Sequence, residues 1–242
     1  MTAARYTVRR AGIRHDSLLE ENVMFHDRKD AGERLAARLL HLKDKQPVVL
    51  ALPRGGVAIG FEIARLLGAP LDIVLVRKIG VPWQPELALG AVADGGGGPP
   101  EIFIDERMAK ALAVPLGYVR DETARQLAEL ERRRQIYSAG RAPVEVVGRT
   151  AIVVDDGIAT GATMRVALRA VRRRGPASLV LAAPVAAAET LASLAGEADE
   201  TVCVEAPGGL GAIGYYYEDF HQMSDAEVTG LLARSTELGA SS

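Results

Sequence analysis

Short, mostly apolar runs alternate with amphipathic segments along most of the chain. Apolar runs of this kind are typical of strands that are covered on both faces, and they lie at residues 47–52, 71–77, 178–185 and 201–206. Apolar residues at helical spacing predict helices over residues 28–42, 57–68 and 191–196 and from Thr160 to Gly175. Asp27 is the expected N-cap of the first helix, and Ser224 with Glu227 forms a capping box that opens a final short helix.

The middle of the chain is less regular. Residues 89–94 predict a weaker strand and residues 101–105 another short one, and the glycines and prolines between them predict a flexible connection. Residues 144–154 predict strand, turn and strand. Residues 115–137 predict a charged surface helix. Its narrow apolar stripe is Leu116, Thr123, Leu127 and Leu130, and its expected ion pairs are Asp121 with Arg125 and Glu129 with Arg133.

Strands that alternate with helices predict an α/β fold with a doubly wound, mostly parallel sheet and helices on both faces. The charged helix then belongs to an inserted helical segment at about residues 105–137. Residues 1–23 are basic and precede the regular pattern, so we expect a loosely ordered tail there. Ligands of doubly wound sheets bind at the carboxyl ends of the strands, which is where functional residues are expected.

Composition narrows the classes of function. The chain has 242 residues, with 29 basic against 31 acidic side chains, which argues against general attraction to nucleic acid or to an anionic membrane. The single cysteine, Cys203, cannot form an internal disulfide and is expected to be a buried structural thiol. No apolar run reaches the ~18 residues of a membrane span, and the first residues lack the apolar stretch of a secretory signal. We therefore expect a cytoplasmic protein.

Three loops at expected carboxyl ends of strands combine glycines with polar residues: LPRGG (52–56), VRKIG (76–80) and DDGIATGAT (155–163). In the last loop, small residues and threonine hydroxyls at a helix N-terminus suit a phosphate group, because several N–H groups can point inward. Asp155 and Asp156 can accept hydrogen bonds from a vicinal diol or hold a hydrated divalent cation such as Mg²⁺. A phosphate beside a diol describes a sugar phosphate.

Each motif also has a structural alternative. The two acids could cap the following turn, LPRGG could be a strand-to-helix turn that needs glycine, and Arg77 with Lys78 could be the solvated end of a strand. Two other matches are rejected. GLGAIG (209–214) fits the dinucleotide fingerprint but leads into YYYEDF rather than a helix, and GGVAIGFE (55–62) lacks the Lys and Ser/Thr of a P-loop. The four histidines show no ligand spacing and are interpreted as surface residues.

VVDDGIATGAT (153–163) follows the other two loops along the chain, and it resembles the signature of the type I phosphoribosyltransferases. ALPRGGVAIGFEIA, LVRKIGVPWQPELALGAV and IGYYYEDF extend the similarity over about residues 24–235, to a bacterial group of predicted phosphoribosyltransferases. The resemblance implies a domain over residues 24–242 with a C-terminal hood at about 205–235. It also implies 5-phosphoribosyl 1-pyrophosphate as donor, Mg²⁺ as cofactor, and release of pyrophosphate on transfer to a nitrogenous, nucleobase-like acceptor. A homodimer stays open, and no nucleic-acid or membrane partner is expected.

The resemblance implies a role for each loop. Asp155 and Asp156 would hold the ribose hydroxyls and, through water, Mg²⁺. The implied contacts of the 5′-phosphate are Ala159, Thr160, Gly161, Ala162 and Thr163, and those of pyrophosphate are Arg54, Gly55, Gly56, Arg77 and Lys78. The implied catalytic residues are Asp155, Asp156, Arg77 and Lys78, and the implied acceptor contacts are Tyr215, Tyr216 and Tyr217. The Arg54–Gly55 peptide is expected to be cis, and VPWQPE (81–86) is expected to be a mobile lid or its hinge.

One position departs from the family pattern. Relatives that act on 6-oxopurines usually carry an acid between the two aspartates and the T-G pair, where this chain has Ala159. The identity of the acceptor is therefore left open. The departure also keeps a second class of function in view, a regulatory module that binds phosphoribosyl pyrophosphate or a nucleotide without turnover. A hydrolase acting on a ribose phosphate ranks last, because the sequence offers no dedicated nucleophile.

Overall fold

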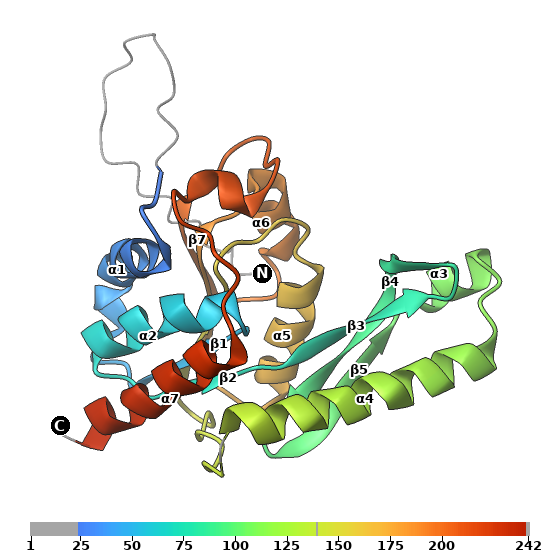
Figure 1. Ribbon diagram of the computed structural model, residues 1–242, viewed down its shortest axis with the longest axis horizontal. Coiled ribbons are helices and arrows are strands. Elements are labelled where there is room, and N and C mark those ends of the chain that lie inside the picture. Colours follow the sequence, from blue (N-terminus) through green and yellow to red (C-terminus); the bar gives the residue numbers. More distant parts are fainter. Residues whose placement is uncertain (1–23, 139, 241–242) are drawn as a thin grey trace, which may run out of the picture.

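A five-stranded parallel sheet forms the centre of the computed structural model, which describes residues 24–138 and 140–240 (Figure 1). The expected tail at residues 1–23 lies outside the described residues. The strand order is β2-β1-β6-β7-β8, and every neighbouring pair is parallel. The strands are β1 (Pro47–Ala51), β2 (Leu71–Ile73), β6 (Thr150–Val154), β7 (Ser178–Val185) and β8 (Glu200–Glu205). The predicted parallel sheet is confirmed.

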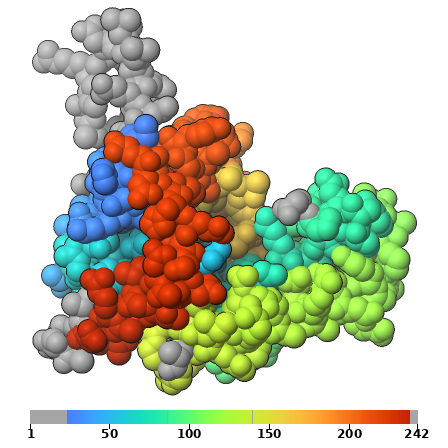
Figure 2. Space-filling view, in the orientation of Figure 1, coloured from blue at the N-terminus to red at the C-terminus, as the bar shows by residue number. Residues whose placement is uncertain are grey.

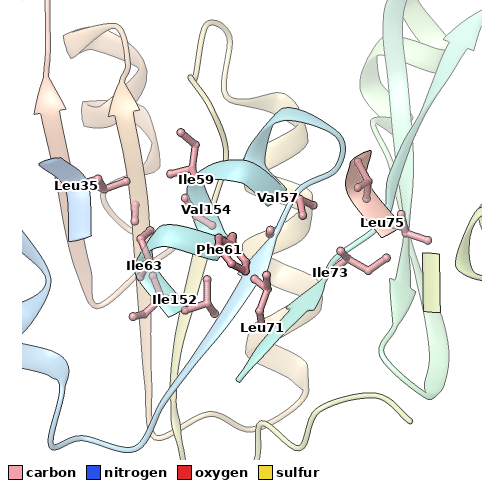
Figure 3. Packing of buried hydrophobic residues seen from close by; sticks show 14 of the residues in the cluster. Leu35, Val57, Ile59, Phe61, Ile63, Leu71, Ile73, Leu75, Ile152 and Val154 are labelled. Atoms are coloured by element: carbon pink, nitrogen blue, oxygen red, sulfur yellow. The ribbon is translucent and has the colours of Figure 1, made fainter. Parts of the chain in front are cut away.

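Helices cover both faces of this sheet. One face packs against α1 (Arg28–Arg38) and α2 (Gly55–Leu67), and the other against α5 (Ala162–Arg173) and α6 (Ala188–Leu194). Alternate residues of one strand serve the two faces: Ile152 lies in the cluster that contains Ile59 and Ile63 of α2 (Figure 3), whereas Val153 lies in the cluster that contains Leu168 of α5. The doubly wound fold follows from the inner strands β1, β6 and β7, which are apolar at every position after the first.

The apolar run at residues 71–77 does not form one strand. β2 ends at Ile73, and the chain enters a second, antiparallel sheet of β3 (Val76–Val81), β4 (Gln84–Gly95) and β5 (Gly98–Ile104). The expected flexible connection at the glycine run is instead a tight hairpin turn, in which Gly96 and Gly97 adopt positive φ angles. With the helices that follow, this sheet forms an arm (residues 76–138) that projects from the body (Figures 1 and 2).

The predicted insertion helix is α4 (Leu116–Ser138), preceded by the short α3 (Glu106–Ala111), and it packs along β3 and β4. The expected pair of Glu129 with Arg133 is confirmed, at 2.9 Å between Oε1 and Nε. The expected pair of Asp121 with Arg125 is wrong, since Arg125 binds the carboxylate of Glu122 one position nearer along the helix. Leu130 is buried, but Leu116 at the start of the predicted stripe is exposed because it precedes the part of the helix that meets the sheet.

Residues 144–149 are not the strand that their apolar character predicts. The N–H of Val144 donates to Asp72 Oδ2, and Glu145 accepts the N–H groups of Val146 and Val147. These backbone N–H groups are therefore bound to side chains and are not available for hydrogen bonds to a neighbouring strand. The following strand, β6, already has β1 and β7 on its two sides, so this segment has no free edge beside it.

The C-terminal part of the chain crosses the body face seen in Figure 2, where it is red and orange. It contains the short 3-10 helix η2 (Ile213–Tyr216) and α7 (Asp225–Ala240), and another 3-10 helix, η1 (Leu40–Leu42), follows α1. The predicted capping box is confirmed: Glu227 N–H donates to Ser224 Oγ, and Ser224 N–H donates to the Glu227 carboxylate. Among the described residues, no helix combines the length and the apolar character that crossing a bilayer requires.

Candidate active site

The sheet reverses its winding direction between β1 and β6. The chain leaves β1 through α2 toward β2 on one side, and leaves β6 through α5 toward β7 on the other. Crevices at such reversals, outside the carboxyl ends of the strands, are where open α/β sheets bind ligands. The loops at residues 52–56 and 155–163 both begin here, because Ala51 is in register with Val154.

The glycine loop lies directly against the acidic pair. Leu52 N–H donates to Val154 O at 2.9 Å, which continues the pairing of β1 with β6 beyond the strand ends. A Cβ atom added at Gly55 would lie 1.8 Å from Asp156 Oδ2, and one at Gly56 would lie 2.8 Å from Val154 O. Glycine is thus required for this approach. The cis peptide of the loop is Pro53–Arg54, one bond before the expected position.

The two acids differ in their surroundings. Asp156 N–H donates to Asp155 Oδ1 at 2.9 Å. Burial raises the pKa of the Asp155 carboxyl well above its usual range, and the neighbouring Asp156 carboxylate raises it further. The Asp156 carboxylate accepts a hydrogen bond from Arg28 Nε at 2.8 Å. Part of the cost of two adjacent acids is therefore offset by a cation within the chain.

Arg28 is the functional candidate that sequence reasoning missed. It is the first residue of α1, and it is buried. A cation at a helix N-terminus opposes the helix dipole, so an arginine directly after the N-cap Asp27 is the signal that could have identified it. The predicted cap itself is confirmed, since Asp27 accepts the N–H of Asp30.

The loop at residues 159–163 presents unpaired backbone groups at the start of α5. Gly161 is the N-cap, with φ at 75°, and no side chain caps the helix. Thr190 Oγ1 donates to Ala159 O at 2.6 Å, which fastens the loop from α6. Within the described ranges, no acceptor is found for the N–H groups of Ala159, Thr160 and Gly161. Such a helix start suits an anion.

Residues 213–221, which we call the hood segment, lie over this loop. A Cβ atom at Gly157 would lie 2.4 Å from Ile213 Cγ2, so the contact is close. Tyr217 is buried, and its hydroxyl donates to Asp156 O at 2.6 Å. Tyr216 is buried too, whereas the side chain of Tyr215 is 76 % exposed. Of the three tyrosines, only Tyr215 presents its ring to an incoming molecule.

The third predicted loop is not at a carboxyl end of the central sheet. Arg77 and Lys78 lie within β3 of the arm. Arg77 Nε donates to Gln126 Oε1 of α4 at 2.9 Å, and burial lowers the pKa of its guanidinium. Lys78 is exposed. In the part of the chain that is described, neither side chain contacts the acidic pair, so the structure brings together two of the three predicted loops.

Arg54 points toward the C-terminal helix. Its Nη1 lies 4.0 Å from Asp225 Oδ1, which also accepts the Tyr137 hydroxyl at 2.6 Å. The arm, the glycine loop and α7 thus meet at one carboxylate. The exposed Trp83 lies in the turn between β3 and β4, within the segment expected to be a lid or hinge.

The remaining sequence-based interpretations concern residues outside the site. Cys203 is half-buried rather than buried. Burial of its thiol still raises the pKa to about 12, which keeps it protonated and fits a structural role. His26, His41 and His221 are exposed, as expected. GLGAIG lies in a loop and η2 rather than in a strand-to-helix turn, and Gly60 of the rejected P-loop match lies inside α2. Both rejections are confirmed.

The metal-binding side chains of the site suit a cation that the bound ligand also helps to hold. Among residues 24–138 and 140–240, no group of three or more His, Cys, Asp or Glu side chains could bind a metal. In the loop at residues 155–163, Asp155 and Asp156 supply the carboxylate oxygen atoms. This matches Mg²⁺, which proteins commonly bind through one or two carboxylates together with water and substrate phosphates.

The family model and the curated relatives that match this chain both carry the name phosphoribosyl transferase. The family model described as "Phosphoribosyl transferase domain" matches residues 103–212, which include the acidic pair and the loop after it. "Putative phosphoribosyl transferase Rv0571c" of Mycobacterium tuberculosis (strain H37Rv) is 43% identical over 212 residues, 88% of this chain and 47% of that protein. The chain therefore spans about half the length of this relative and of its counterpart MT0597 in strain CDC 1551. TT1426 from Thermus thermophilus is 42% identical with a TM-score of 0.75, over 87% of this chain and 98% of that structure.

Proposed function

The chain belongs to the phosphoribosyl transferase family, and from this premise we propose that it transfers the phosphoribosyl group of 5-phosphoribosyl 1-pyrophosphate to a nitrogenous acceptor. The observation that carries the proposal is the contact between the glycine loop and the acidic pair, beside an uncapped helix start. These features would serve pyrophosphate, ribose and 5′-phosphate in turn. A location in the cytoplasm and a homodimer stay predictions.

In this proposal, different residues bind the 5′-phosphate, the ribose and the pyrophosphate of the donor. The N–H groups at residues 159–161 and the start of α5 bind the 5′-phosphate, with Thr160 and Thr163 hydroxyls as further donors. Asp155 and Asp156 accept hydrogen bonds from the ribose hydroxyls. The start of α2 at Gly55 faces the pyrophosphate, and the Arg54 guanidinium would turn from Asp225 to contact it.

The reaction would be a displacement at the anomeric carbon. A lone pair of the acceptor nitrogen forms the new C–N bond, the C–O bond to pyrophosphate breaks, and pyrophosphate leaves with that electron pair. The carboxylates beneath the ribose stabilise the positive charge that develops on it. The hood segment excludes water, which would otherwise compete with the acceptor nitrogen.

Mg²⁺ would be held by Asp155 and Asp156, through water, together with the donor's pyrophosphate oxygens. When bound, it supplies charge neutralisation for the leaving pyrophosphate. Arg77 and Lys78 stay proposed pyrophosphate contacts. In the structure Arg77 Nε donates to Gln126, so a contact with pyrophosphate would need a different position of the Arg77 side chain.

For the acceptor, the exposed ring of Tyr215 is the proposed stacking surface, since it is the one hood tyrosine that a base can reach. The second candidate function is donor binding without turnover. The observation that favours it is Ala159, which supplies no acid or base at the position where relatives acting on 6-oxopurines carry one.

Calorimetry with Mg²⁺ and phosphoribosyl pyrophosphate tests the donor site. We expect saturable binding that requires Mg²⁺ and is lost in Asp155→Asn/Asp156→Asn, because neutral amides neither hold the cation nor accept both ribose hydroxyls as carboxylates do. The matched control is Asp44→Asn, an exposed acid three residues before β1 and so at the opposite end of the sheet. Equal binding by wild type and the double variant, with unchanged circular dichroism, would remove these aspartates from the site.

An assay of pyrophosphate release distinguishes the transferase from a module that binds the donor without turnover. The protein is incubated with donor, Mg²⁺ and a pool of nitrogenous bases, and pyrophosphate is measured against a reaction without base. Turnover that depends on base is the expected outcome. Tight donor binding without turnover for any base would favour the regulatory module.

A further inference from the structure

Arg28 joins three parts of the chain that lie far apart in the sequence. Its Nε donates to Asp156 Oδ2 at 2.8 Å, and its Nη1 donates to the backbone oxygen of His221 at 2.8 Å. The guanidinium also lies over the Phe220 ring, at 4.0 Å from the centroid. One side chain of α1 therefore contacts both the acidic pair and the end of the hood segment.

These contacts are almost closed to solvent. The side chains of Arg28 and Asp156 are 10 % and 14 % exposed. A planar guanidinium can serve two acceptors at once, which an ammonium group on a flexible stem does poorly. The two hydrogen bonds of Arg28 therefore depend on the planar shape of its guanidinium as well as on its charge.

The hood segment also forms backbone hydrogen bonds with residues 25 and 26. Glu218 N–H donates to Phe25 O, Asp219 N–H donates to His26 O, and Phe25 N–H donates to Tyr216 O, all just before α1. Tyr217 adds its hydroxyl bond to Asp156 O. The hood thus lies along residues 25–26 and on the acidic pair, and Arg28 connects these two supports.

We propose that Arg28 is a positioning residue that couples the acidic pair to the hood segment, so that a ligand on Asp156 changes the order of the hood. The inference rests on the proposed function, because that ligand is the ribose and cation of the donor. A cation or diol on Asp156 competes with Arg28 Nε for the same oxygen. The resulting shift of the guanidinium reaches the hood through Nη1 and the Phe220 ring.

Hydrogen exchange of the Glu218 and Asp219 amides, followed by mass spectrometry of peptides over residues 216–221, tests the connection in the ligand-free protein. Arg28→Gln should speed exchange there about tenfold or more, since the hood loses one of its supports. Arg28→Lys keeps the charge beside Asp156, so it should restore the unfolding midpoint while leaving the hood exchange fast. The control Arg38→Gln removes an exposed arginine of the same helix that donates to Cys203 O, and should change nothing in the hood.

Two results would overturn the proposal. One is hood exchange in Arg28→Lys equal to that of wild type, which would leave Arg28 as a counter-charge only.

The other result concerns the coupling, which is measured as the change in hood exchange when Mg²⁺ and phosphoribosyl pyrophosphate are added as the probe. The probe should alter hood exchange in wild type, whereas Arg28→Lys should bind the probe with no response in the hood. A wild-type response retained by Arg28→Lys would refute coupling. If wild type does not bind the probe, the proposed function and the coupling fail, and the ligand-free comparison alone decides the connection between Arg28 and the hood.

Discussion

At the scale of single residues, Gly55 shows how little room the candidate site leaves. Its backbone lies so close to Asp156 that any side chain would overlap the carboxylate. We predict that Gly55→Ala loses Mg²⁺-dependent donor binding and destabilises the fold by about 1–3 kcal/mol, as overpacked sites do. Calorimetry and urea denaturation measure the two effects.

Gly230→Ala is the matched control for this variant. It lies within α7, where an added Cβ would meet nothing within 4 Å. Higher helix propensity should leave stability unchanged or raised by up to ~1 kcal/mol, with donor binding intact. Donor binding by Gly55→Ala at the wild-type level would contradict the close approach.

One part of the candidate site could be predicted from residue types, and another part could not. The acidic pair, the glycine loop and the threonine loop could be predicted, because carboxylates, φ-permissive residues and hydroxyls each have restricted uses. Arg28 could not be paired with Asp156 from the sequence, since residues 128 positions apart meet only through the tertiary fold. Likewise, that Tyr217 faces inward and Tyr215 outward depends on the short helix η2.

At the scale of elements, the N-termini of two helices were predicted correctly, whereas the first helix ends at Arg38 and not at Leu42. Asp27 and Ser224 bond neighbours three residues away, so their geometry is local. The break in the run at residues 71–77 was not predictable from apolar character. The boundary arises because Asp94 of β4 accepts the N–H of Leu75 and so draws the chain into the second sheet.

The capping box of α7 provides a prediction at this scale. Ser224→Ala should lower the free energy of unfolding by about 1 kcal/mol, because the Glu227 amide loses its acceptor at the helix start. Urea denaturation gives the value. Thr229→Ala, an exposed hydroxyl inside the same helix, should stay within ~0.5 kcal/mol of wild type. Equal effects of the two substitutions would show that the capping bonds contribute nothing specific.

At the scale of the whole molecule, one buried ion pair fixes the base of the arm. Arg134 Nε of α4 donates to Asp94 Oδ2 at 2.6 Å, and the other oxygen of Asp94 accepts Leu75 N–H beside the central sheet. Burial raises the pKa of Asp94 in spite of the opposing effect of Arg134. The carboxylate therefore depends on its partner to remain charged.

Removal of that partner should be costly. We predict that Arg134→Met destabilises the protein by about 3–5 kcal/mol at neutral pH, because a buried carboxylate loses its counter-charge. Arg132→Met, on the same helix but 58 % exposed and paired with Glu129, should cost about 0–1 kcal/mol. Thermal and urea unfolding compare the two variants, and similar losses would mean that the Asp94 pair does not hold the arm.

The adjacency of β1 and β6 has a consequence for how this protein is made. Pro47 is in register with Thr150, and the entire arm is synthesised between them. Contacts so remote along the chain form late, since closing the intervening segment costs entropy before any pairing offsets it. We therefore expect a nascent or truncated chain to lack even a rudimentary form of the candidate site, because the glycine loop and the aspartates become neighbours only when folding is nearly complete.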